Sequence, residues 1–256
     1  GEDFLAHRVE DRVDGRAADD RGVSVLRSSI QLSDLAFDVL WKQERLGEYH
    51  PALSVDSPGE TEDERAVIER DVIGELRRVG LDHPDVRGTL HLIAKADQDY
   101  SAWIAVTPRE TKPVVVAANS QHGVLAVHDN GFVQLHPIRP ENAPEVLAMQ
   151  LPDVPAGRGA SINVHESEIN VHQAGKASPS IALRQLLAQP RKGTAKLYAA
   201  KRNGEGRQRA KTFLTTIDFE DGRWLVVKYT DQNQQTWVHA TPASRQIITD
   251  WLKRLT

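Results

Sequence analysis

Two runs of four short strand patterns, about a hundred residues apart, constrain the fold of this chain most strongly. In each run, short apolar segments rich in β-branched and aromatic residues alternate with turn residues. Connections this short join neighbouring strands in an antiparallel arrangement. Asn130-Gly131 and Asp221-Gly222 are residue pairs that favour tight hairpin turns. The predicted strands are 101–107, 112–119, 123–129 and 131–137 in the first run, and 195–202, 211–220, 223–231 and 235–242 in the second.

Helical patterns precede and follow each run of strands. This shared order predicts an α+β protein with an internal duplication, in which two quasi-two-fold related antiparallel meanders share a sheet or pack as twins. The last helix is predicted to begin near Pro242, since proline is favoured in a first turn. Short strands are predicted at 29–33, 52–55 and 161–165, and helices at 34–46, 62–79, 84–95, 141–150 and 179–189.

The composition along the chain predicts one folded domain behind a charged leader. Residues 1–27 are dense in Asp, Glu and Arg and poor in large apolar groups, so we expect that segment to be disordered. The domain is predicted to span 28–256, with half-repeats at 28–151 and 179–256. Residues 152–178 are rich in Gly, Ala, Ser and Pro, which is typical of a mobile connector.

The acidic stretch "SPGETEDER" predicts a helix start. Thr61 and Glu64 have the spacing of a capping box, in which each side chain bonds the backbone N–H of the other residue. Further carboxylates in the first turn complement the helix dipole. We therefore interpret these acids as helix caps, without a chemical role.

Composition excludes several classes of function. The chain has no cysteine, which removes disulfides, thiolate metal sites and cysteine nucleophiles. A net charge of −4 without a basic stripe argues against nucleic-acid binding. No apolar run has the length of a membrane span or the form of a signal peptide, so a cytoplasmic protein is expected.

Two chemical alternatives stay open. His165, Glu166 and His172 could serve a metal-assisted hydrolase, although their spacing differs from the H-E-x-x-H pattern that places two imidazoles on one helix face. A small-molecule binding domain with its ligand between the halves is the other alternative. Aromatic and apolar strand residues favour a third interpretation, a surface on which a partner helix docks.

The region 32–65 resembles the start of the EspG family, the secretion chaperones of type VII (ESX) systems. The resemblance lies in the segments "FDVLW" and "LGEYHP" and in the run Ser57, Gly59, Thr61, Glu64 and Arg65, and by layout it extends over 28–256. It implies a cytosolic protein without enzymatic activity or cofactor, and compatible with a homodimer, that binds the hydrophobic helical tip of PE–PPE substrates. It also implies a central sheet flanked by two helical bundles.

The partner surface of the family uses the central sheet and the C-terminal bundle, which places the expected contacts in the second half of the chain and at one hairpin of the first. The expected partner-binding residues are Arg109, Glu110, Thr111, Leu183, Leu187, Arg207, Phe213, Leu214, Thr216, Trp224, Val226 and Trp237.

Overall fold

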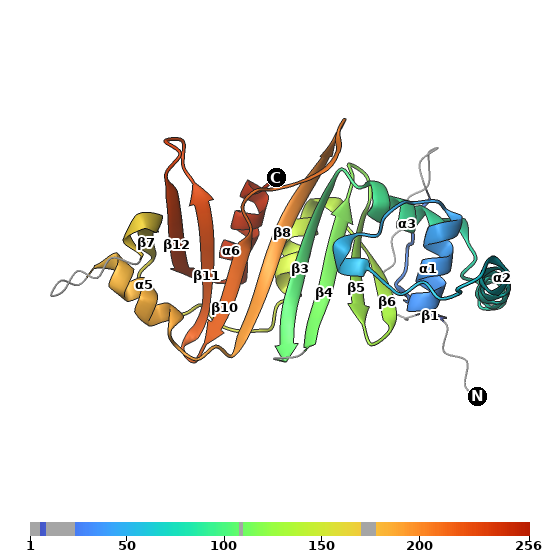
Figure 1. The fold of residues 1–256 in the computed structure, drawn as a ribbon, viewed down its shortest axis with the longest axis horizontal. Coiled ribbons are helices and arrows are strands. Elements are labelled where there is room, and N and C mark those ends of the chain that lie inside the picture. The colour runs from blue at the N-terminus through green and yellow to red at the C-terminus, as the bar shows by residue number, and fades with distance from the viewer. Residues whose placement is uncertain (1–5, 9–23, 108–109, 170–177) are drawn as a thin grey trace. The chain divides into compact units, whose positions relative to one another are not determined.

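A computed structural model describes residues 6–8, 24–107, 110–169 and 178–256 (Figure 1). Its contacts divide the chain into two compact units. The first unit comprises 1–99, 113–143 and 202–206, and the second comprises 100–112, 144–201 and 207–256.

The first unit holds antiparallel strands in the order β1-β2-β6-β5-β4, together with three α-helices. Its helices supply a closely packed apolar core that includes Phe37 and Trp41, both almost fully buried. The strands are β1 (Ala6–Arg8), β2 (Ile30–Ser33), β4 (Glu110–Ala118), β5 (Gly123–Asp129) and β6 (Phe132–Ile138). The helices are α1 (Asp34–Gln43), α2 (Glu62–Arg78) and α3 (Pro84–Lys95), with 3-10 turns η1 (Pro51–Leu53) and η2 (Pro140–Asn142).

The second unit holds the strand order β3-β8-β10-β11-β12-β7, with β9 paired to β8. The registers from β8 to β7 are antiparallel throughout. The strands are β3 (Gln98–Thr107), β7 (Ile162–His165), β8 (Gly193–Asn203), β9 (Gly206–Arg209), β10 (Leu214–Phe219), β11 (Gly222–Thr230) and β12 (Thr236–Pro242). The helical segments are α4 (Ala143–Met149), η3 (Glu166–Glu168), α5 (Pro179–Leu187) and α6 (Arg245–Arg254).

The acidic loop before α2 forms part of the scaffold. The capping box between Thr61 and Glu64 is complete, as predicted. Arg65 then reaches back to the fully buried carboxylate of Asp38 on α1, with 2.5 Å between its Nη1 and Oδ2. The same Nη1 donates to the carbonyl of Pro58 at 3.2 Å. One arginine therefore joins two helices and fixes the loop between them.

Most of the predicted elements are confirmed, with four corrections. Strand β1 lies within 1–27, which was expected to be disordered; residues 1–5 and 9–23 of that segment lie outside the described residues. Residues 52–55, expected as a strand, contribute to the 3-10 turn η1. The second run contains the additional strand β9, and β10 begins only at Leu214. Pro242 ends β12, and Ser244 caps α6 by accepting from the amide of Ile247. The fold is mixed α+β with extensive antiparallel sheet, as predicted. The quasi-two-fold duplication stays a prediction.

Candidate functional site

Three aromatic rings gather on one sheet face of the second unit, and we call them the aromatic patch: Trp103, Tyr198 and Phe213. Trp103 on β3 meets Tyr198 on β8 edge to face, with 5.2 Å between ring centroids. Tyr198 stacks on Phe213, which directly precedes β10, at 5.3 Å. Trp103 and Tyr198 are half-buried, and Phe213 keeps 39% of its surface exposed. The aromatic patch is therefore a largely apolar surface that is partly open to solvent.

Two positively charged side chains, Lys196 and Arg209, lie beside the aromatic patch. Side chains two residues apart on a strand lie on the same face, so Lys196 shares the face of Tyr198 on β8. The guanidinium carbon of Arg209, on β9, lies 4.7 Å from the centroid of the Tyr198 ring. Both cations are exposed. The aromatic patch is therefore bordered by two positively charged side chains.

Helix α6 covers the opposite face of this sheet. His239 of β12 packs against Trp251 of α6, with 5.8 Å between ring centroids. The hydroxyl of Tyr100 on β3 lies 3.0 Å from Oγ1 of Thr256, just past the helix. Burial lowers the pKa of His239 below its ordinary value. Figure 1 shows α6 behind the sheet next to β10, and among the described residues of the second unit it shows no helix in front of β8 or β10.

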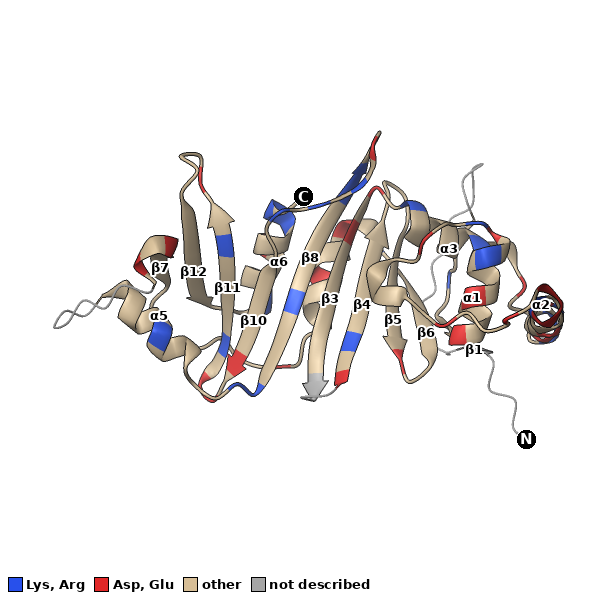
Figure 2. Ribbon diagram, in the orientation of Figure 1, with Lys and Arg blue, Asp and Glu red and all other residues tan. Residues whose placement is uncertain are grey.

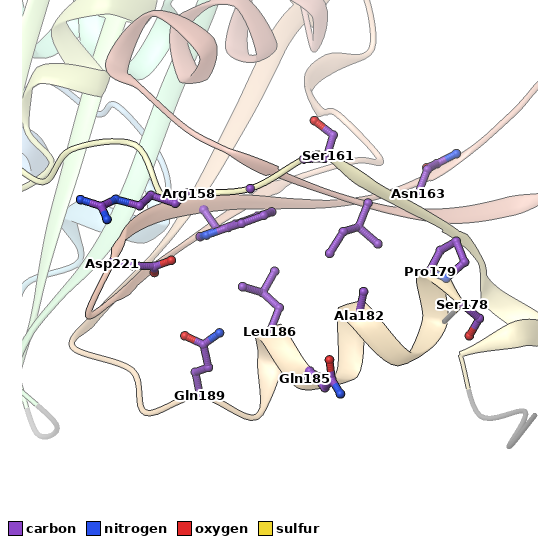
Figure 3. Close-up of a pocket in the computed structure, with 14 residues that line it drawn as sticks. Arg158, Ser161, Asn163, Ser178, Pro179, Ala182, Gln185, Leu186, Gln189 and Asp221 are labelled. Atoms are coloured by element: carbon purple, nitrogen blue, oxygen red, sulfur yellow. The ribbon is translucent and has the colours of Figure 1, made fainter. Parts of the chain in front are cut away.

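Helix α5 lies on the same face of the sheet as the aromatic patch, but it covers the part formed by β7, β12, β11 and the end of β10. Leu183 and Leu186 of α5 join a buried cluster with Val164, Ile217 and Trp224. Beside this cluster lies a groove of about 620 Å³, which opens between α5 and the chain from Arg158 to Asn163 (Figure 3). Its lining is mixed, with apolar side chains from α5 and β7 and the amide side chains of Asn163, Gln185 and Gln189.

Trp224 lines this groove, and the loop before β7 packs against its indole. It is only 3% exposed, and its Nε1 has no hydrogen-bond partner among the described residues. Gly157 lies so close to the indole that a Cβ at this position would approach Cδ1 to 2.5 Å. Trp224 is therefore a core residue.

The twelve expected contact residues differ in their burial, and four of them belong to the core. Leu183, Leu214, Thr216 and Trp224 are at most 3% exposed, which corrects the expectation that they lie on the surface. Leu214 and Thr216 are buried because alternate residues of a strand point to opposite faces of the sheet. They pair with Leu197 and Ala195, and these side chains lie on the face that α6 covers.

Seven of the remaining expected residues lie outside the core. Leu187 and Val226 are half-buried against the α5 cluster. Trp237 is also half-buried; it packs edge to face on His165 and donates to Asp231 at 3.0 Å. Phe213, Glu110 and Thr111 are exposed, Arg207 is half-buried on β9, and Arg109 lies outside the described residues.

Sequence reasoning missed Trp103 and Tyr198 as surface aromatics. Neither residue is among the twelve expected contact residues. A signal for Tyr198 was available, because the alternation Ala195, Lys196, Leu197 already marks even-numbered positions of this strand as the polar side. Tyr198 continues that side.

Two of the three residues proposed for a metal centre have other partners. Nδ1 of His165 lies 2.7 Å from the hydroxyl of Ser167, and Glu166 forms an ion pair with Lys228. His172 lies outside the described residues. Within the described part of the chain, no group of three or more His, Asp or Glu residues is arranged to hold a metal ion. No helix in that part combines the length and apolar character of a membrane span.

Comparisons with known proteins bear on both fold and family. The model of the EspG family matches residues 33–254. Among solved structures, the chain resembles the Mycobacterium tuberculosis type VII secretion system chaperone EspG5, determined in complex with a PE25–PPE41 dimer. The TM-score is 0.68 at 15% identity, over 89% of this chain and 95% of that chain. The search of curated proteins found no match.

Proposed function

This chain belongs to the EspG family, and we propose that it is a cytoplasmic chaperone for a PE–PPE heterodimer, or a similarly helical substrate, of a type VII secretion system. Its role would be to bind and not to transform its client. The observation that carries the proposal is the aromatic patch, which lies on a part of the sheet that no helix among the described residues of the second unit covers. The complex described for EspG5 supports the class of partner.

The proposed binding mode follows from the chemistry of the patch. An apolar helical tip exposed on a client would be an aggregation liability until another surface covers it. Rings such as Trp103, Tyr198 and Phe213 bring large contact areas with few rotatable bonds, so ordering them costs little entropy. Trp103 and Tyr198 already contact each other edge to face, so this part of the aromatic patch is ordered before the client binds.

Co-expression with the native client tests the proposal. Phe213→Ala combined with Tyr198→Ala should abolish co-purification of the PE–PPE client while the protein stays folded by circular dichroism. The matched control is Val67→Ala, which also removes an exposed apolar side chain, 46% accessible on α2. This control should retain the client. Normal client recovery with the patch variant would show that another surface binds, and measurable turnover of a substrate would contradict a purely binding role.

A further inference from the structure

The cations beside the aromatic patch have no acidic partners among the described residues. Lys196 on β8 and Arg209 on β9 are exposed, and within the described residues neither forms an ion pair. Lys211, between Arg209 and Phe213 in sequence, is also exposed and unpaired within the described part of the chain. Ion pairs do form elsewhere in this unit, at Lys192 with Glu220 and between Lys228 and Glu166.

The positive charge beside the aromatic patch is opposite in sign to the net charge of the protein. The protein as a whole carries −4, and α2 begins with consecutive acids. At physiological ionic strength, charges act mainly within about 8 Å. A partner that approaches the aromatic patch therefore senses mainly the charged side chains beside the patch, which include Lys196 and Arg209. Figure 2 shows positions of Lys and Arg, coloured blue, along β8.

Arg209 is arranged to receive an anion at low entropic cost. Its guanidinium lies over the Tyr198 ring, a contact that holds a cation without neutralising its charge. Ordering a free arginine side chain on binding costs conformational entropy, and stacking on Tyr198 has already restricted it. A carboxylate beside the aromatic patch could therefore accept two parallel hydrogen bonds from the guanidinium of Arg209.

Resting on the function proposed above, we infer that this surface selects clients whose apolar helical tip is flanked by carboxylates. Apolar contact with Trp103, Tyr198 and Phe213 would supply most of the affinity. The cations would supply discrimination and a faster approach, because charges at the edge of an interface act on association rate and partner choice more than on total affinity. A client with lysines beside its tip would be rejected.

Three designed helical hairpins test this inference. They carry the same Leu and Phe tip and differ only in the flanking residues, which are Glu, Gln or Lys. Two exposed charges predict that the Glu hairpin binds about 2- to 30-fold more tightly than the Gln hairpin near 0.1 M salt. The Lys hairpin should bind most weakly, and the three dissociation constants should converge at about 0.5 M salt because salt screens exposed charges.

Charge-reversal variants complete the test. Lys196→Glu with Arg209→Glu should invert the order of the three hairpins. Lys201→Glu is the matched control, since it is exposed on the same strand five residues away, and an odd separation places it on the opposite face. Equal binding of all hairpins, or an order that the double variant leaves unchanged, would overturn the inference alone. Failure of all three to bind would contradict the docking surface itself.

Discussion

Replacing Gly157 with alanine tests how tightly the loop before β7 holds the core of the second unit. The added Cβ would lie 2.5 Å from Cδ1 and 3.1 Å from Cε2 of Trp224, and closer still to Nε1. The indole cannot move away easily, because it is 3% exposed and packs within the α5 cluster. Overpacking of this kind costs about 1–3 kcal/mol of the free energy of unfolding.

Urea unfolding followed by tryptophan fluorescence measures this cost. Gly204→Ala is the matched control, because the methyl group that it adds would meet no atom within 4 Å, and its change should stay within about 0.5 kcal/mol. Client affinity should be unchanged for Gly157→Ala under conditions where it is folded, since Trp224 is a core residue. Equal stabilities for the two variants would refute the close packing of Gly157 on Trp224.

Three further predictions concern stability. Thr61→Ala removes the acceptor of the α2 capping box and should lower the free energy of unfolding by about 0.5–2 kcal/mol in urea titrations. Arg223→Met leaves the buried Asp218 carboxylate without the two bonds that it now accepts, at 2.6 and 2.8 Å, and should cost about 3–5 kcal/mol, whereas Arg223→Met with Asp218→Leu should recover much of that loss. Because burial lowers the pKa of His239 below 6.5, the unfolded chain binds more protons between the lowered value and 6.5, and stability should fall as the pH drops through that window. His239→Gln should flatten this part of the stability curve, and an unchanged slope would assign the effect to another group.

The sequence predicted the elements that local interactions determine. The cap at Ser33 and the capping box at Thr61 involve residues three positions apart, so their spacing alone identifies the helix starts. Strand β9 was missed because "GRQR" has no apolar alternation, and it is ordered instead by pairing with β8. Residues 52–55 look like a strand by composition, but His50 and Pro51 begin a 3-10 turn there.

The contact face was harder to predict because it depends on which helix covers which side of a strand. Alternation separates Thr216 from Thr215, but it does not say which of the two faces the solvent. That choice is fixed by α6, on one face, and by α5, on part of the other, and both helices are far from β10 in sequence. Of the expected contact residues, Phe213 is exposed, whereas Trp224, nearby in sequence, belongs to the α5 cluster.

The most direct test of the central claim is photo-crosslinking from the patch itself. The photoreactive amino acid benzoylphenylalanine, placed at Phe213, should form a covalent adduct with the PE–PPE client, and mass spectrometry should locate it at the apolar helical tip. The same group at Val67, 46% exposed on α2, should give no adduct. A client that binds fully without crosslinking at Phe213, or that crosslinks only at Val67, would contradict the account.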